Sequence, residues 1–181
     1  MRIPIMDVIL TENREPVLIK KQTRLYKDLQ NICNPKDVVL LMTDVFQMNR
    51  QITEQVYLLT MDNKGTPLGF FFLNQGTVNS SLVDTRGIFI RILLTNASKF
   101  ILMHNHTSGN PFPSSQDYWM TKRLKELSEV MGVTFDDHII IGNGNGDGSY
   151  YSFLEQLWTE KQTGAKSENN YESEEILCLQ N

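Results

Sequence analysis

The sequence predicts an α/β fold in which helices flank a mixed central sheet. Residues 100–103 form the apolar run Phe-Ile-Leu-Met, which indicates a central strand buried on both faces, since a half-exposed strand would alternate polar and apolar residues. Residues 114–131 carry apolar side chains at helical spacing and precede Gly132, a residue type that commonly ends helices. Residues 133–141 form a second apolar strand. This order of elements is typical of a layered α/β sheet.

The first 50 residues predict a hairpin followed by a helix. Residues 2–21 alternate loosely between apolar and polar positions around the polar turn 11–14, which is typical of two paired strands. Asn34 and Pro35 introduce residues 36–48, whose apolar side chains recur at helical spacing, with proline at the first helical position. We expect this helix to pack on the sheet through its apolar stripe.

The middle of the chain predicts more strands and one more helix. Residues 55–61 and 67–73 are apolar segments separated by a polar turn that contains glycine, which indicates two paired strands. The polar stretch 75–81 is either a connection or an edge strand. Residues 84–96 predict a helix that begins at an aspartate or threonine cap, and residues 150–153 predict a short last strand.

The C-terminal part divides into a turn and a tail. Residues 142–148 are rich in glycine, but no helix with a Lys-Ser/Thr pair follows them, so we interpret them as a long turn rather than a phosphate loop. The polar, acidic end of the chain predicts a loosely held tail. We therefore divide the chain into an N-terminal hairpin and helix (1–50), a main domain (51–158) and the tail (159–181).

Length and cysteine content favour a single globular core. The chain has 181 residues, of which 40% are hydrophobic, enough for one domain with a sizeable core. Cys33 and Cys178 are too few for a disulfide framework or a thiolate zinc site. The sequence has neither a signal peptide nor an apolar segment long enough to span a membrane. We expect a cytoplasmic protein without a membrane partner.

The net charge is concentrated at the C-terminal end. The formal charge is −4, and residues 155–181 hold six glutamates against two lysines. The preceding part is therefore near neutral. It lacks the basic face expected of a protein that binds nucleic acid by neutralising phosphates.

The stretch after the apolar run predicts a metal site. His104 and His106 are two residues apart at the end of the expected strand, so both imidazoles point to one side and can bind one ion. Asp117 is the best third ligand, because the intervening loop can bring the next helix beside the strand end. Imidazole and carboxylate ligands favour zinc over magnesium or calcium.

Other interpretations of these residues remain open. Ser114 and Asp117 have the spacing of a helix-capping box, although a carboxylate with two oxygens can both cap a helix and bind a metal. The chain has three histidines, too few for hydrolases that need four or more. Nucleobase deaminases are disfavoured because their H-x-E and P-C-x-x-C elements are missing. We interpret His138, within an expected strand, as structural rather than ligating.

The spacing of these residues resembles a known protease motif. His104-x-His106, seven residues, Ser114, two residues and Asp117 is similar to the JAMM motif, also called JAB or MPN+. More narrowly, residues 103–111 and 137–142 resemble the RadC family, and the similarity extends over about 54–153. The resemblance implies a JAMM/cytidine-deaminase-like α-β-α layered fold and one Zn²⁺ per chain.

The resemblance also implies a reaction and its residues. Glu54 corresponds to the general acid/base of the family, and Ser114 to a hydroxyl that stabilises the oxyanion. A zinc metallopeptidase of this type cleaves an amide or isopeptide bond with metal-activated water, so the expected partner is a peptide or isopeptide substrate. The alternative is a RadC-like accessory protein of DNA repair with little peptidase activity, and only then would nucleic acid be a partner.

Two positions depart from the RadC pattern. The family usually has proline at Thr107 and glutamate at Gly87. The first change loosens the loop after the two histidines without removing a metal-binding atom. The second alters a helix on the expected substrate side, so the substrate preference of the family is not carried over.

Overall fold

A seven-stranded mixed sheet forms the centre of the molecule. The structure is a computed structural model that describes residues 1–76, 84–142 and 149–156. Within these residues the strand order is β2-β1-β4-β3-β5-β6-β7. The strands are β1 (Arg2–Leu10), β2 (Pro16–Leu25), β3 (Gln55–Met61), β4 (Pro67–Gln75), β5 (Lys99–Asn105), β6 (Thr134–Ile141) and β7 (Tyr150–Ser152). The helices are α1 (Pro35–Phe46), the short 3₁₀ helix η1 (Met48–Arg50), α2 (Thr85–Leu94) and α3 (Ser115–Met131).

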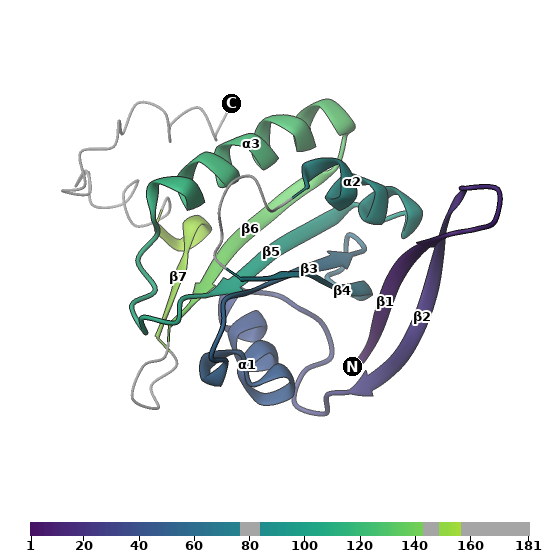
Figure 1. Cartoon of the computed structure of the whole chain (residues 1–181). Helices are drawn as coiled ribbons and strands as arrows, with labels where there is room; N and C mark the ends of the chain where they lie inside the picture. Colours follow the sequence, from purple (N-terminus) through teal and green to yellow (C-terminus); the bar gives the residue numbers. More distant parts are fainter. Residues whose placement is uncertain (77–83, 143–148, 157–181) are drawn as a thin grey trace.

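Helices cover both faces of this sheet, which confirms the predicted α-β-α layers. Helix α1 lies on one face, and α2 and α3 lie on the other (Figure 1). The side chains of β5 alternate between the two layers, as the pleat of a strand requires. Ile101 and Met103 belong to the core on the α1 face, whereas Phe100 and Leu102 belong to the core beneath α2 and α3.

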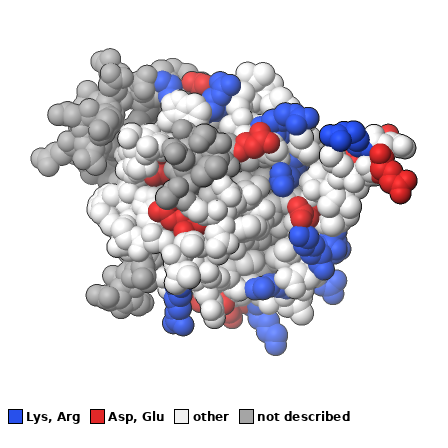
Figure 2. All heavy atoms as spheres, viewed as in Figure 1, with Lys and Arg blue, Asp and Glu red and all other residues white. Residues whose placement is uncertain are grey.

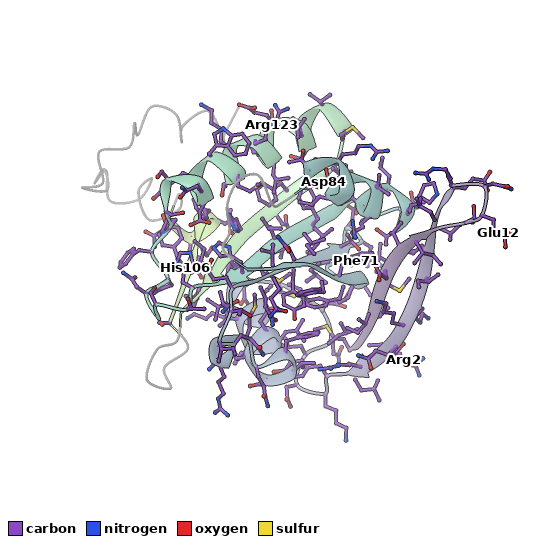
Figure 3. The ribbon with its side chains drawn as sticks, in the orientation of Figure 1. Arg2, Glu12, Phe71, Asp84, His106 and Arg123 are labelled. Carbon is purple, nitrogen blue, oxygen red and sulfur yellow. The ribbon has the colours of Figure 1, made fainter. Side chains whose placement is uncertain are left out.

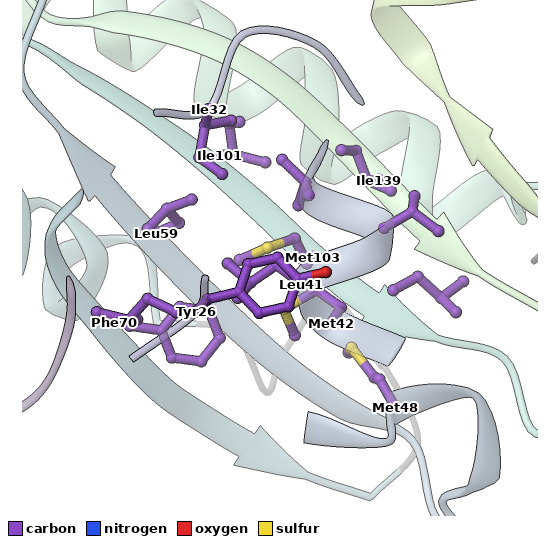
Figure 4. Packing of buried hydrophobic residues seen from close by; sticks show 14 of the residues in the cluster. Tyr26, Ile32, Leu41, Met42, Met48, Leu59, Phe70, Ile101, Met103 and Ile139 are labelled. Carbon is purple, nitrogen blue, oxygen red and sulfur yellow. The ribbon is translucent and has the colours of Figure 1, made fainter. Parts of the chain in front are cut away.

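The core on the α1 face is built from aliphatic, methionine and aromatic side chains. Leu41 and Met42 of α1 are fully buried and lie against Met103 and Ile139 of the sheet in Figure 4. Burial of a large apolar side chain contributes about 1.5–3 kcal/mol relative to exposure. This packing fixes the position of β5, whose end carries the predicted ligands.

The N-terminal predictions are confirmed, with changes at the element ends. The hairpin forms, but β2 continues to Leu25. Helix α1 begins as expected, with a capping box between Asn34 and Asp37, yet it ends at Phe46 rather than at residue 48. The reason is local: Gln47 adopts a left-handed backbone with φ 51°, and Met48 then starts η1.

The remaining predicted elements are found where the structure describes them. Helix α3 has Ser114 as its N-cap and Gly132 as its left-handed C-cap, as predicted. Strand β4 includes Gln75, the first residue of the expected polar connection. The rest of that connection from residue 77, most of the glycine-rich turn (143–148) and the predicted tail (159–181) lie outside the described residues. Among the described residues, no helix is both long and apolar enough to cross a bilayer.

The connection from β5 through α3 to β6 defines one edge of the sheet. Strands β5 and β6 are parallel neighbours, and α3 crosses between them over one face (Figure 1). The end of β5 and the start of α3 therefore lie at the same edge. In α/β proteins this edge, at the carboxyl ends of the strands, is the usual place for a binding site.

Candidate metal centre

The two predicted histidine ligands converge at the end of β5. His104 lies in β5, and His106 follows its last residue. Their Nε2 atoms are 3.1 Å apart. The backbone N–H of His106 donates to the carbonyl of Ile141 at 3.0 Å, which continues the alignment with β6. Figure 3 shows His106 at this end of the molecule, far from Glu12 at the tip of the hairpin.

Asp117 serves as a helix cap and also faces the histidines. Its Oδ2 atom accepts hydrogen bonds from the backbone N–H of Ser114 at 2.7 Å and from the Ser114 hydroxyl at 2.6 Å. Its Oδ1 atom is buried and has no hydrogen-bond partner among the described residues, although it lies 3.1 Å from His104 Nε2. The capping box is therefore confirmed, and it leaves the Oδ1 atom of Asp117 available for the proposed metal.

The two imidazole nitrogens and the carboxylate lie close enough together to suit a single metal ion. Asp117 Oδ1 lies 3.1 Å from His104 Nε2, and Asp117 Oδ2 lies 3.4 Å from His106 Nε2. The edge of a tetrahedron with zinc–ligand bonds of 2.0–2.1 Å measures about 3.3 Å. A buried carboxylate oxygen without a donor is costly unless a cation or hydrogen bond satisfies it. These residues therefore fit a metal ion, and their N and O donors suit zinc.

Electrostatics favour a charged carboxylate between the two rings. Burial opposes ionisation of Asp117, but its contacts with His104 and His106 outweigh burial and hold its pKa well below the usual range. Burial also lowers the pKa of His106, yet the Asp117 carboxylate, the Asn110 carbonyl and the charge of Glu54 together raise it above the ordinary value.

His138 lies next to the predicted ligands and offers a second set. A ring nitrogen of His138 and ligand atoms of His104 and Asp117 lie within 4.8 Å of one another. However, His138 Nε2 is 2.9 Å from His104 Nδ1, whereas His104 Nε2 faces His106 and Asp117. The two nitrogens of one imidazole point apart, so a single ion binds only one of them. We favour the set that contains His106, and His138 outside it remains a prediction.

Two hydrogen bonds from the Asn105 side chain hold the backbone around Glu54 beside His106. Residue 56 pairs with His104 in the antiparallel β3–β5 ladder, so Glu54 is two residues further along, opposite His106. The side chain of Asn105 accepts from the backbone N–H of Gln55 at 2.8 Å and donates to the carbonyl of Thr53 at 3.2 Å. It thus fixes the backbone on both sides of Glu54. The effect of Glu54 on the pKa of His106 agrees with this proximity.

The loop after His106 closes the other side of the site. Gly109 takes a left-handed φ of 82°, which glycine adopts at little cost, and its N–H donates to the carbonyl of His106. The Asn110 carbonyl lies 3.0 Å from His106 Nδ1. A Cβ atom on Gly142 would come within 2.5 Å of the Gly109 carbonyl oxygen, so this packing requires glycine. Thr107, one of the departures from the RadC pattern, is exposed.

Two residues with contacts in the site were not predicted from the sequence. Asn105 stands between the ligands and is 2% exposed, but nothing local shows that β3 is its neighbour. Thr121 is four residues after Asp117, on the same face of α3, and its hydroxyl donates to the Asp117 carbonyl at 2.7 Å. The spacing of four residues from Asp117 within a predicted helix is the sequence feature that could have identified Thr121.

Comparisons with known proteins identify the family to which this chain is similar. Residues 32–158 match the RadC-like JAB domain family. A UPF0758 protein of Clostridium kluyveri is 37% identical over 128 residues, which is 70% of this chain and 55% of the relative. A UPF0758 protein of Clostridium acetobutylicum is 35% identical over 139 residues, covering 75% and 58%, and one of Methanosarcina acetivorans is 37% identical over 123 residues, covering 68% and 53%. The chain spans about half the length of these curated relatives.

Proposed function

Because this chain belongs to the RadC-like JAB domain family, we propose that it is a zinc-dependent hydrolase of the JAMM type that cleaves an amide or isopeptide bond. The observation that carries this proposal is the set of three facing ligand atoms. The buried Asp117 Oδ1 has no hydrogen-bond partner in the described part of the chain, and it lies 3.1 Å from the Nε2 atom of His104. His104, His106 and Asp117 would hold the ion.

Each residue of the site has a separate task. Zinc in such a site supplies Lewis acidity, which polarises a carbonyl and lowers the pKa of a water molecule from 15.7 toward about 7. Glu54, close enough to affect the pKa of His106, accepts a proton from the attacking water and passes it to the leaving amine. The two hydrogen bonds of the Asn105 side chain keep the backbone of Glu54 in place for both proton transfers.

Ser114 has a structural role and a proposed catalytic one. Its hydroxyl donates to Asp117 Oδ2 at 2.6 Å, which orients the carboxylate. In the reaction we propose that this hydroxyl turns its one hydrogen from Asp117 Oδ2 to the oxyanion that forms when the carbonyl is attacked. Loss of one such donor typically lowers the rate by about 10²–10³.

The surface beside the site suits an uncharged or apolar stretch of peptide. Ile52 and Phe112 are 93% and 65% exposed, and they lie on the segments that lead to Glu54 and to Ser114. On the face shown in Figure 2, Lys and Arg side chains lie along the upper edge over α2 and α3, over the β1–β2 hairpin and along the lower side, and they do not gather at the end of β5. Substrate binding at this end therefore does not depend on a basic surface.

The proposal is tested by metal content and turnover together. We expect one zinc per chain in the wild type and in Glu54→Gln, and less than one tenth of that in Asp117→Ala. A panel of fluorogenic peptides and isopeptides should be cleaved by the wild type, and Glu54→Gln should lower the rate by at least about 10². Glu126→Gln, an exposed carboxylate on α3, is the matched control and should keep both properties.

Two outcomes would contradict the proposal. Zinc content that does not change in Asp117→Ala would return Ser114 and Asp117 to a purely capping role. Full turnover by a zinc-loaded Glu54→Gln variant would remove Glu54 from the reaction.

A further inference from the structure

We propose that Thr121 and His138 are positioning residues that fix the tautomer of His104, so that its Nε2 lone pair points at the metal position. The inference rests on the proposed metal centre for its purpose, but it is carried by a chain of hydrogen bonds within the protein. The chain begins at the backbone of one predicted ligand, Asp117, and ends at the ring of another.

Three short contacts make up this chain. Thr121 Oγ1 lies 2.7 Å from the Asp117 carbonyl oxygen and 2.7 Å from His138 Nδ1. His138 Nε2 lies 2.9 Å from His104 Nδ1. The side chains of Thr121, His138 and His104 are at most 4% exposed. No bulk water is available to replace these partners, so the protein groups must satisfy one another.

The direction of every hydrogen bond follows from the carbonyl. A carbonyl oxygen only accepts, so the single hydroxyl hydrogen of Thr121 is used there. Thr121 Oγ1 must then accept from His138 Nδ1–H. An imidazole with one hydrogen on Nδ1 has a lone pair on Nε2, so His138 Nε2 accepts from His104 Nδ1–H. His104 Nε2 is the nitrogen that remains for the metal, and it faces His106 and Asp117.

A second proton on His138 would not fit this environment. The ring is 1% exposed and stacks on Phe153, with centroids 5.2 Å apart and planes 5° apart. No carboxylate contacts either of its nitrogens among the described residues, and a buried charge without a partner is very costly. The His138 ring therefore carries a single hydrogen. That hydrogen is on Nδ1, and Nε2 accepts from His104.

This arrangement is informative because the acceptor is an imidazole. Metal-binding histidines usually donate their second N–H to a carboxylate, a backbone carbonyl or water. An uncharged acceptor orients the His104 ring, but it polarises the Nδ1–H bond less than a carboxylate does. His104 Nε2 is therefore a less basic ligand for the ion. His106 has the ordinary partner, the backbone carbonyl of Asn110.

The test combines zinc affinity with the tautomer in the metal-free protein. Thr121→Val removes the hydroxyl at nearly constant volume, and His138→Phe keeps the stacking on Phe153 but removes the acceptor. We expect each to weaken zinc binding by about 10- to 100-fold, the range for outer partners of metal ligands, in competition with a chromophoric chelator. Thr121→Ser should bind within about threefold of the wild type.

A matched control separates this role from a general loss of a helix hydroxyl. Thr43 in α1 makes the same kind of bond, from its hydroxyl to the carbonyl four residues earlier at 2.9 Å, on the opposite face of the sheet. Thr43→Val should leave zinc affinity unchanged. If His138→Phe does not fold, the Thr121 variants still decide the question.

Nitrogen-15 NMR of the ring nitrogens provides the second measurement. The chain has three histidines, so His106→Ala and His138→Phe assign the spectrum. In metal-free wild type, we expect a hydrogen on His104 Nδ1, and in Thr121→Val we expect Nδ1 to lose it in part of the molecules. A wild-type Nδ1 of His104 without a hydrogen, or unchanged zinc affinity in both Thr121→Val and His138→Phe, would overturn the inference. If the wild type binds no zinc, the proposed function fails, while the spectrum still decides the tautomer.

Discussion

The two histidines of the candidate metal centre are held in different ways. His104 is 1% exposed and its outer nitrogen contacts His138, deep between β6 and α3. His106 has a side chain that is 14% exposed, and its outer nitrogen contacts the Asn110 carbonyl in a loop. Thus one ligand is fixed by the core of the sheet, and the other by a segment that folds over its edge.

This difference indicates which part of the site has its final geometry before a metal or substrate binds. The supports of His104 come from α3 and β6, elements that also bury Leu124 and Ile139 completely. The supports of His106 come from one turn that begins with Gly109 N–H donating to His106. We infer that the His104 side is part of the folding core and that the His106 side adjusts without unfolding the protein.

The largest expected effect separates the two ligands by stability. His104→Ala leaves a cavity in the core and removes the partner of the buried His138 Nε2, so we expect a loss of about 3 kcal/mol in the free energy of unfolding. His106→Ala should cost about 1 kcal/mol or less, because its ring is partly solvated. Urea unfolding with a chelator present measures both without metal.

Zinc binding should not share this asymmetry. Both variants remove a proposed ligand, so we expect each to weaken zinc binding by more than about 100-fold, beyond the loss caused by outer partners. Equal stabilities of the two variants would break the comparison. Wild-type zinc affinity in His106→Ala would move the ligand set to His104, Asp117 and His138.

The second prediction concerns the support behind His138. Asp137 is 5% exposed and accepts hydrogen bonds from the backbone N–H of His138 at 2.7 Å, from that of Leu154 at 3.0 Å and from the Ser152 hydroxyl at 2.6 Å. Burial raises the pKa of Asp137 from 3.8 to about 7. The carboxyl therefore stays protonated in the folded protein while the unfolded chain ionises.

This raised pKa gives stability a definite pH dependence. Stability from Asp137 is complete below pH 3.8 and falls as pH rises to about 7. Between pH 5 and 7 the loss amounts to about 3 kcal/mol, at 1.36 kcal/mol per pH unit. Asp137→Asn cannot ionise, so unfolding of the variant and the wild type should diverge by this amount in that window and stay parallel above pH 8.

A neighbouring carboxylate provides the control. Asp136 is partly exposed and lies 3.6 Å from Lys99, so Asp136→Asn should show no comparable divergence between pH 5 and 7. The free energies of unfolding of the wild type and Asp137→Asn could instead differ by a constant amount from pH 5 to 8. That result would show that Asp137 ionises normally and that water reaches this part of the core.

The sequence could predict the features of the site that follow from local patterns, but not those that depend on strand pairing. The alternation of a strand placed His104 and His106 on one side, and the Ser114–Asp117 spacing marked the start of α3. Both are local rules, and both held. The position of Leu102 opposite His138 depends on the pairing of β5 with β6, which no local pattern specifies.

Long-range pairing also hid the role of Asn105. Its side chain reaches Thr53 and Gln55, about 50 positions earlier in the chain, only because β3 lies next to β5 in the sheet. The helix end at Phe46 was missed for another reason, since the left-handed backbone of Gln47 is rare for a residue other than glycine. The convergence of the three proposed ligands was thus predictable, and the residues that support them were not.

The smallest expected effect tests the loop side through Gly142. A Cβ atom there would lie 2.5 Å from the Gly109 carbonyl oxygen and 3.0 Å from Pro111, so Gly142→Ala must shift the loop that holds His106. We expect a loss of about 1–2 kcal/mol in stability and about tenfold weaker zinc binding. Gly132→Ala is the control: its φ of 67° makes alanine strained by about 1–2 kcal/mol, but nothing lies within 4 Å of the added atom. It should lose similar stability at unchanged zinc affinity. If both variants bind zinc equally, the loop does not support His106, and the core side alone forms the site.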